Sequence, residues 1–274
     1  MILKNKLYHI YEQLALILSQ LKFICATTFS TLPQQINKIV VGDNKLPSYF
    51  NDSIQEITSS DLNGVTIIDD EMFKNRANLM SLETSDSVIK IQSSAFRELP
   101  NLQTVVIGNS VTNIDSYAFY NCDKLTNVTI GNSVTNIGSY AFANCDNLTN
   151  VTIGNSVTSI GSNAFYWCKK LTNLVIPDSV TTIDTYAFGN NTGLNSIYIG
   201  KGIKNIGTYA FYGCSYVYDL YIYATTPPQL ATSNSIGINP YSGKIHVPIG
   251  SGDAYKSATN WSSLASRIVE DIEI

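Results

Sequence analysis

The chain repeats itself with a 23-residue period. Two neighbouring copies, "NVTIGNSVTNIGSYAFANCDNLT" from Asn127 and "NVTIGNSVTSIGSNAFYWCKKLT" from Asn150, are nearly identical. An anchor leucine marks the same place in each unit, at Leu79, Leu102, Leu125, Leu148, Leu171 and Leu194, and Val217 continues the series. A single unit of this length cannot bury its apolar side chains alone, whereas stacked units can, so the repeat predicts a solenoid.

Each unit divides into three pieces. The L-x-x-V-x-I piece alternates as a short strand does, and stacking predicts a parallel β-sheet with one strand per coil. The S-V-T-x-I piece is also extended and β-branched, which favours a second short strand. The A-F-x-x-C piece is expected to form one turn of helix against the core. The expected fold class is therefore a mainly β or α/β-type solenoid with short helical turns.

These repeats resemble the BspA-like leucine-rich-repeat family, whose 23-residue unit carries the signature I-G-x-x-A-F-x-x-C. The resemblance is carried by "SVTNIGSYAFANC", "SVTSIGSNAFYWC" and "GIKNIGTYAFYGC", and it covers about residues 56–223. It extends into residues 224–274, which look like the C-terminal cap of the family. The resemblance implies a leucine-rich-repeat sheet and, in microbes, attachment to host-cell or matrix proteins.

The tail also has a physical interpretation of its own. It contains a proline-rich exit, a strand-like stretch at Lys244–Val247 and a short helical stretch from near Ser251. Trp261 and Leu264 offer apolar cover. We expect this segment to close the last coil, because an open edge strand is free to pair with other chains.

The N-terminal segment, residues 1–25, breaks from the repeat and predicts a helix. Its apolar residues are spaced alternately by four and three, as in a coiled coil, at Leu3, Leu7, Ile10, Leu14, Ile17, Leu21 and Ile24. Leucine at the a positions with isoleucine at the d positions favours more than two strands, so we expect a homo-oligomer, a trimer or higher. Two alternatives are a helix that caps the solenoid and a degenerate export signal. Residues 26–55 are expected to be a connector.

Composition excludes several classes of partner. The net charge is −4 and only 14% of the residues are charged, so no basic patch predicts nucleic-acid binding. No apolar run reaches the length of about 18 residues that predicts a membrane span. Four cysteines share one repeat position, Cys122, Cys145, Cys168 and Cys214, and Asn191 replaces them in one coil. That replacement favours a small buried side chain over a metal or redox site.

No catalytic motif or cofactor motif is present. The two histidines, His9 and His246, lie far apart, and the chain lacks a phosphate loop, an HExxH motif and a G-x-S-x-G motif. We therefore expect a protein that is not an enzyme and holds no cofactor and no metal.

Candidate binding residues lie at the outward positions of the main strands, two and four places after each anchor. They are small and polar in the earlier coils and aromatic in the later ones. The candidates are Asn127, Thr129, Asn150, Thr152, Asn173, Tyr198 and Tyr221. Tyrosine and asparagine suit contacts to proteins and glycans. A second column, Tyr117, Tyr140, Asn163, Tyr186 and Tyr209, is expected to pack over the turn and cover the core.

The sequence therefore favours a recognition or adhesion protein that binds a host-surface protein or glycan. A multimerising N-terminus with a distal adhesive domain also resembles a phage tail or receptor-binding component, and this hypothesis places the protein in a virion. The alternatives are a bacterial or protist cell-surface or secreted adhesin and an intracellular protein-interaction scaffold. Weak sites on several copies would act together through avidity.

Overall fold

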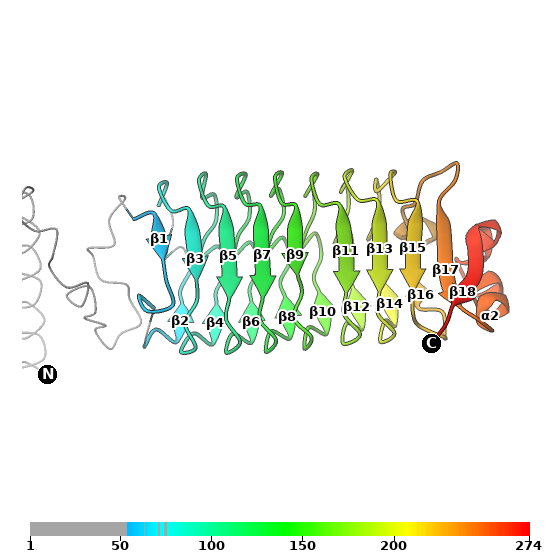
Figure 1. Ribbon diagram of the computed structural model, residues 1–274, viewed down its shortest axis with the longest axis horizontal. Coiled ribbons are helices and arrows are strands. Elements are labelled where there is room, and N and C mark those ends of the chain that lie inside the picture. The colour runs from blue at the N-terminus through cyan, green and yellow to red at the C-terminus, as the bar shows by residue number, and fades with distance from the viewer. Residues whose placement is uncertain (1–53, 63, 71, 74–75) are drawn as a thin grey trace, which may run out of the picture.

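The computed structural model describes residues 54–274, apart from residues 63, 71 and 74–75. In this part of the chain the repeats form successive coils of one elongated solenoid (Figure 1). The parallel-strand solenoid that the 23-residue period predicts is therefore confirmed. The expected helix at 1–25 and almost all of the expected connector at 26–55 lie outside the described residues.

The longer strands form a front sheet of parallel strands that is divided into two parts of five strands. The first part has the order β1-β3-β5-β7-β9, with bounds Glu56–Ile57, Ser81–Glu83, Thr104–Ile107, Asn127–Ile130 and Asn150–Thr152. The second part has the order β11-β13-β15-β17-β18, with bounds Asn173–Ile176, Ser196–Ile199, Asp219–Ile222, Lys244–Pro248 and Ile268–Ile272.

The shorter strands form a back sheet of eight parallel strands without interruption. They are β2 (Ile67–Ile68), β4 (Lys90–Ile91), β6 (Asn113–Ile114), β8 (Asn136–Ile137), β10 (Ser159–Ile160), β12 (Thr182–Ile183), β14 (Asn205–Ile206) and β16 (Gln229–Leu230). The second strand expected from the S-V-T-x-I piece is thus present in each of these coils.

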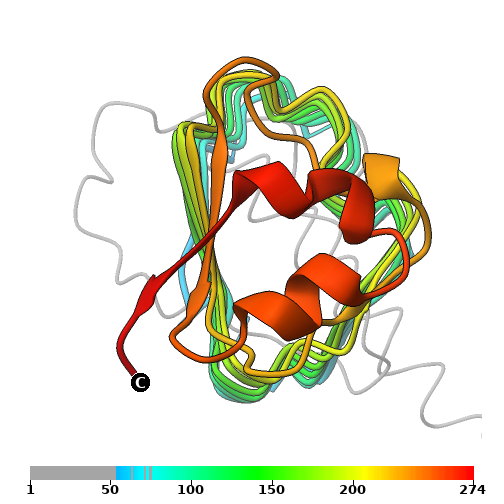
Figure 2. The ribbon, with the colours of Figure 1, turned by 90° about the vertical axis from the view of Figure 1, so that its right-hand side faces the viewer.

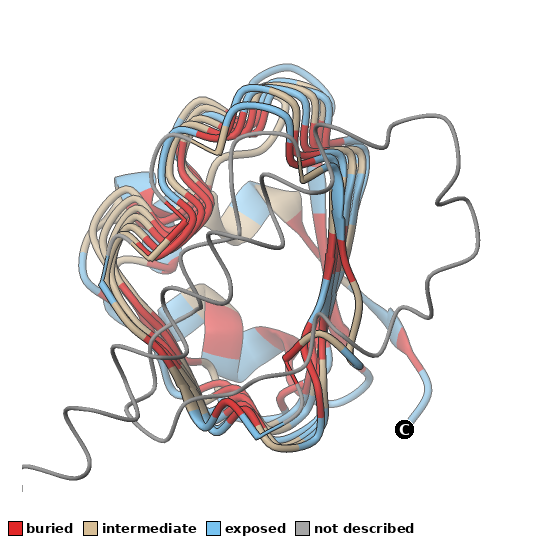
Figure 3. Ribbon diagram, turned by 90° about the vertical axis from the view of Figure 1, so that its left-hand side faces the viewer, coloured by how far each residue is buried: buried red, intermediate tan, exposed pale blue. Residues whose placement is uncertain are grey.

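The core lies between the two sheets and is built from equivalent residues of successive coils. Phe119, Phe142 and Phe165 are fully buried, and their rings stack at centroid distances of 5.0 and 5.1 Å. The stack continues in both directions, from Phe73 to Phe211. Buried positions accordingly follow the inner side of every coil (Figure 3). No coil encloses this interior alone, so each repeat depends on its neighbours for its stability.

The segment around each Ala-Phe pair differs from the expected turn of helix. It forms consecutive tight turns, because two residues in each unit, such as Tyr117 and Asn121, have φ near +60°. The backbone N–H groups of Tyr117, Phe119 and Asn121 donate to carbonyl groups of the next coil, at 2.7–2.9 Å. A helical turn would direct these donors within the coil. The tight turns instead add a third set of hydrogen bonds that joins coil to coil.

The front sheet is interrupted between β9 and β11. No backbone hydrogen bond joins these two strands, whereas the strands behind them, β10 and β12, remain paired. The core is less completely covered beside this break, because Val151 is only partly buried and Ile153 is 7% exposed. The break is visible as the wider step between β9 and β11 in Figure 1.

Pro177 explains the break. It occupies the repeat position that holds glycine in the preceding coils, at Gly108, Gly131 and Gly154. These coils stack so closely there that a Cβ atom added to Gly154 would lie 2.7 Å from the carbonyl carbon of Gly131. A proline ring needs that same space, so the coil that carries Pro177 stands away from Gly154.

The C-terminal segment covers the last coil (Figure 2). It contains the following short helices: η2 (Ser233–Ser235), α2 (Gly252–Ser257) and η3 (Ser262–Arg267). Trp261 and Tyr255 are fully buried, and Leu264 packs against the core. The Trp261 indole donates to the Pro228 carbonyl at 2.7 Å, and the Tyr255 hydroxyl donates to the Ala224 carbonyl at 2.7 Å. Both polar groups are therefore satisfied while their rings seal the interior.

Candidate binding face

The outward side chains of the front sheet form two rows that run along the solenoid. The sequence-predicted candidates are found in these rows, because strand pairing aligns equivalent positions of successive repeats. Asn127, Asn150 and Asn173 are exposed members of the first row, and Thr129 and Thr152 are exposed members of the second. The structure therefore brings the polar candidates together on one surface.

The first row is held by hydrogen bonds between coils. The Asn150 amide donates to the Asn127 side-chain oxygen at 3.0 Å. The Ser196 hydroxyl donates to the Asn173 side-chain oxygen at 2.8 Å. These bonds fix the orientation of the side chains, so a ligand would meet a polar surface that is already ordered.

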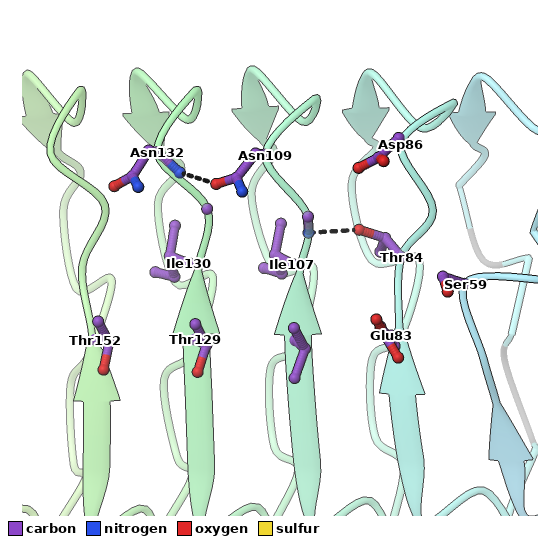
Figure 4. A pocket seen from close by; sticks show the side chains of 13 residues that line it. Ser59, Glu83, Thr84, Asp86, Ile107, Asn109, Thr129, Ile130, Asn132 and Thr152 are labelled. Atoms are coloured by element: carbon purple, nitrogen blue, oxygen red, sulfur yellow. Dashed lines mark hydrogen bonds between the residues drawn. The ribbon is translucent and has the colours of Figure 1, made fainter.

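A shallow hollow of about 440 Å³ lies where β3, β5, β7 and β9 end (Figure 4). Glu83 on β3, Thr129 on β7 and Thr152 on β9 line it (Figure 4). Val106 on β5 is also part of the lining. Asn109 and Asn132 lie at its rim, and the Asn132 backbone N–H donates to the Asn109 side-chain oxygen at 2.8 Å. Sequence reasoning identified the threonines but missed the asparagines, which follow the strands as part of the G-N-S turn.

At the other end of the face, three rings of the second row form a continuous stack. The Tyr198 and Tyr221 rings are parallel within 2° at a centroid distance of 4.8 Å. The imidazole of His246, on β17, lies on the other side of Tyr221 at 4.4 Å. Both tyrosines are half-buried, so their faces are largely covered while their edges remain accessible.

Two carboxylates hold the end of this stack. His246 Nε2 lies 2.9 Å from an Asp219 carboxylate oxygen, and His246 Nδ1 lies 2.8 Å from an Asp271 carboxylate oxygen. Asp271 belongs to β18, so this contact also ties the last strand to the stack. Burial raises the pKa of the Tyr221 hydroxyl, and the nearby Asp219 carboxylate acts in the same direction. The phenol is therefore neutral and can donate a hydrogen bond.

Sequence reasoning found the two tyrosines and missed His246 and Asp271. The strand at Lys244 was expected, but its register was not. Lys244 pairs with Asp219, whereas the repeat period would place Ser242 opposite that residue. The 23-residue period therefore does not extend into the cap. Only the strand pairing shows that His246 continues the tyrosine row.

The cysteine column lies inside the solenoid. Cys122, Cys145, Cys168 and Cys214 are buried free thiols, and each donates to the backbone carbonyl of a phenylalanine at 3.2–3.4 Å. Burial raises the pKa of Cys122 and of Cys214 to about 12 and raises the pKa of the other two thiols as well. Asn191 makes the equivalent bond to the Phe165 carbonyl at 3.0 Å. The column thus has the structural role that the asparagine replacement predicts.

Two further observations concern the described residues. They contain no group of three His, Cys, Asp or Glu side chains that is arranged to hold a metal ion. Within the same residues, no helix has both the length and the apolar character needed to cross a bilayer.

The repeats match the model of the BspA type leucine-rich repeat region, in six copies, over residues 45–171 and 112–226. These matches span more than half of the chain. The chain belongs to the BspA-type leucine-rich-repeat family. Solenoids of this kind typically serve as scaffolds that present an extended binding surface.

Solved structures of bacterial leucine-rich-repeat proteins are similar to the chain. A Treponema pallidum leucine-rich-repeat protein superposes with a TM-score of 0.52 and 23% identity, covering 60% of this chain and 78% of that one. The Bacteroides ovatus leucine-rich-repeat protein has a TM-score of 0.43 and 21% identity, covering 67% and 59%. The pneumococcal vaccine antigen PcpA has a TM-score of 0.44 and 18% identity, covering 78% and 65%. The first likeness agrees with the fold.

No curated protein matches the chain in sequence. The family match is consistent with adhesion or protein interaction, and it favours the cell-surface alternative over the virion hypothesis. Neither comparison bears on the coiled coil expected at Leu3–Ile24, which lies outside the described residues.

Proposed function

We propose that this BspA-type protein is a non-enzymatic adhesin that acts at the cell surface and binds a host-surface protein or glycan. Its binding face is the outward side of the front sheet. The observation that carries this proposal is the stack of Tyr198, Tyr221 and His246 on adjacent strands. Aromatic side chains supply a large contact area with little loss of conformational freedom on binding.

The stack is rigid before any partner arrives. Each ring is supported by its neighbour, and the carboxylates of Asp219 and Asp271 fix the terminal imidazole. A preorganised surface loses less entropy on binding, so more of the interaction energy contributes to affinity. The accessible ring edges and phenol hydroxyls suit hydrogen-bonded contacts with a polar partner.

The polar rows extend the same face towards the N-terminal end. Asn127, Asn150, Asn173, Thr129 and Thr152 give a partner hydrogen-bonding groups over several coils, and the hollow offers a concave region within that surface. A ligand that contacts many coils at once is the kind that a solenoid accommodates. An extended protein surface or a glycan chain meets this requirement.

The chemistry of the described residues supports a role without catalysis. Both ring nitrogens of His246 are engaged by carboxylates, so this histidine has no nitrogen left to activate a nucleophile. The four described thiols are buried and protonated. We therefore propose recognition through shape and hydrogen bonding rather than turnover.

Multimerisation is a separate part of the proposal. We propose that residues 1–25 of several copies associate as a coiled coil, through the apolar positions that include Leu7, Leu14 and Leu21. Binding faces that are individually weak then act together, with a gain set by the effective concentration of the linked sites. The mass of the full-length protein in solution tests this point, because a monomer at micromolar concentration excludes it.

The binding face is tested with protein and glycan arrays and the full-length protein. Tyr198→Ala and Tyr221→Ala should each weaken binding of the captured ligand about tenfold or more, as loss of an aromatic anchor does. Tyr241→Ala is the matched control, because Tyr241 is 92% exposed and lies outside the two rows. Equal binding by all three variants would show that the binding site does not lie on the outward side of the front sheet. Antibody labelling of intact cells tests the location.

A further inference from the structure

A second column of aromatic side chains lies in the turn segments, away from the outward face of the front sheet. Its members directly precede the last five Ala-Phe pairs and have φ between 52° and 60°; they are Tyr117, Tyr140, Asn163, Tyr186 and Tyr209. The Tyr117 and Tyr140 rings stack at 4.9 Å. The Tyr186 and Tyr209 rings stack at 5.0 Å. The column is interrupted in the middle coil, where Asn163 stands in place of a tyrosine.

At the phenylalanine stack, which the break in the front sheet does not reach, the coils on both sides of Asn163 keep their normal spacing. The Phe142, Phe165 and Phe188 rings of the same three coils are 5.1 and 5.2 Å apart. Tyr140 and Tyr186 are therefore two coil spacings apart, and each has its other ring face covered by a neighbouring tyrosine. Two ring faces thus flank the position of Asn163, about where a third ring would lie.

Asn163 fills this position only in part. Its side chain is shorter than that of tyrosine and carries no aromatic ring. Within residues 54–274 as described, its amide makes no hydrogen bond, although its backbone N–H donates to the Thr185 carbonyl at 2.9 Å. An amide without a partner between two ring faces remains available to an incoming group.

We propose that the interrupted tyrosine column binds an aromatic side chain, a tyrosine or phenylalanine, from a partner protein. In four other coils a phenol occupies the equivalent position, so the spacing between neighbouring coils accommodates an aromatic ring there. There it stacks on its neighbour at 4.9–5.0 Å. A ring inserted beside Asn163 would complete the column and gain stacking partners on both faces.

The same coil carries an exposed aromatic residue beside this position. Trp167 has φ 61° and is 41% exposed, at a repeat position that Asn121, Asn144, Asn190 and Gly213 occupy in other coils. A bulky residue in left-handed backbone costs free energy, and this cost is not offset by burial. The Trp167 N–H donates to the Gly189 carbonyl at 3.0 Å, so bonds between coils hold this backbone conformation and present the indole at the surface.

Trp167 also extends the aromatic surface around the interruption. Its ring is nearly parallel to that of Tyr166 at 5.7 Å, and the Tyr166 ring meets Tyr186 edge-on at 5.9 Å. The Lys169 ammonium lies over the indole at 4.9 Å and is engaged by Asp146 at 2.8 Å. A partner would therefore contact tyrosine and tryptophan rings around a single free amide.

The chemistry of this position favours an aromatic ring over a sugar ring. A pyranose is thicker than a phenyl ring, and its hydroxyl groups need several hydrogen-bond partners when they are buried. The free amide of Asn163 supplies few of them. The outward face of the front sheet, with its rows of asparagine and threonine, is better suited to hydroxyl-rich ligands.

The test uses full-length protein and N-acetyl-tyrosinamide as the probe, with saturation-transfer NMR as the readout. We expect weak binding by the wild type and by Asn163→Ala, which leaves the position open. Asn163→Tyr fills the column from within and should weaken binding at least about tenfold. Circular dichroism and the thermal midpoint confirm that Asn163→Tyr is folded, and its own ring should raise that midpoint.

Three results would overturn the inference. They are no binding of the probe by the wild type, equal binding by Asn163→Tyr and the wild type, and binding of methyl glucoside in preference to the probe. Tyr198→Ala and Tyr221→Ala should leave probe binding unchanged. The site is thus independent of the proposed adhesive face, and either proposal can fail without the other.

Discussion

The backbone N–H of Cys168 donates a 2.7 Å hydrogen bond to the side-chain oxygen of Asn191, one coil further along the solenoid. The amide nitrogen of Asn191 donates in turn to the Phe165 carbonyl at 3.0 Å. Asn191 thereby joins its own coil to the one before it through two buried backbone groups. The thiols of the other coils bond to the same class of carbonyl.

Removing the Asn191 side chain should destabilise the protein. Asn191→Ala leaves a buried N–H and a buried C=O without partners, at a cost of about 1–3 kcal/mol for each group. Asn191→Cys restores the side chain found in the other coils and should cost much less. Urea denaturation followed by circular dichroism measures both variants. Equal midpoints for the two variants would show that the hydrogen bonds contribute little.

The buried thiols should make the protein less stable in alkali. Burial raises the pKa of Cys122 and Cys214 to about 12 in the folded chain, above the value near 9 of an exposed thiol. Above pH 9 the unfolded chain loses these protons and the folded chain keeps them, so the free energy of unfolding falls. The fall approaches about 1.4 kcal/mol per pH unit for each thiol between pH 9 and 12.

The matched variant is Cys214→Ser, which removes one buried thiol. Its free energy of unfolding should therefore fall less steeply above pH 9, by the contribution of that one thiol. Cys25→Ser serves as the background, because Cys25 lies outside the described residues. Iodoacetamide labelling at pH 8 should modify the remaining thiols only after denaturation. Rapid labelling in the folded state would contradict the buried arrangement.

Replacing Pro177 by glycine should close the front sheet. Pro177→Gly restores the residue found at this position in the preceding coils and removes the ring that holds the two coils apart. The Thr172 N–H is then expected to reach the Thr149 carbonyl, as the Asn195 N–H reaches the Thr172 carbonyl at 2.8 Å. Hydrogen exchange at Thr172 and Asn173 should slow by at least about tenfold, since the equivalent N–H groups of Thr149 and Asn150 both donate to the previous coil.

Gly154→Ala provides the converse experiment. An added Cβ would lie 2.7 Å from the carbonyl carbon of Gly131, so we expect a second break, between β7 and β9. Exchange should then accelerate at Thr149 and Asn150, whose N–H groups donate to the Thr126 carbonyl. Unchanged hydrogen exchange in both variants would mean that the residue at the Gly154 and Pro177 repeat position does not control the spacing of the coils.

Truncating Trp261 should open the C-terminal end of the core. Its indole is fully buried, and Trp261→Ala removes both that ring and the bond to the Pro228 carbonyl. The expected loss is about 3–5 kcal/mol of unfolding free energy. Tyr255→Phe is the milder comparison, since it removes only the bond to the Ala224 carbonyl and should cost about 1 kcal/mol.

The solenoid was predictable because every repeat unit carries the same pattern of inward and outward residues. Val128 and Ile130 alternate with outward residues, and the same alternation recurs in each successive repeat. A repeated pattern of this kind gives the strands, their parallel order and their register together. The conformation of the turn segments was harder to predict, because Tyr117 adopts left-handed backbone, which tyrosine does not favour. Hydrogen bonds between coils stabilise this conformation, and a single unit does not show them.

The candidate site was predictable only where the period holds. Tyr198 and Tyr221 follow from their repeat position, but His246 and Asp271 belong to the cap, whose pairing has a different spacing. The break at Pro177 depends on how closely backbones approach at Gly131 and Gly154. That distance is a property of the stacked coils and is absent from a single unit.

The interruption at Pro177 also determines how the molecule responds to force. An adhesin of the proposed kind would be pulled along its length, and in a stacked solenoid the hydrogen bonds between successive coils share that force. Between β9 and β11 the front sheet contributes no such bond, so the force falls on the β10–β12 pair and on the bonds between turn segments, such as that from the Phe165 N–H to the Ala187 carbonyl. Under tension the two halves should tilt apart at this junction first, which lengthens the tether while each half remains folded.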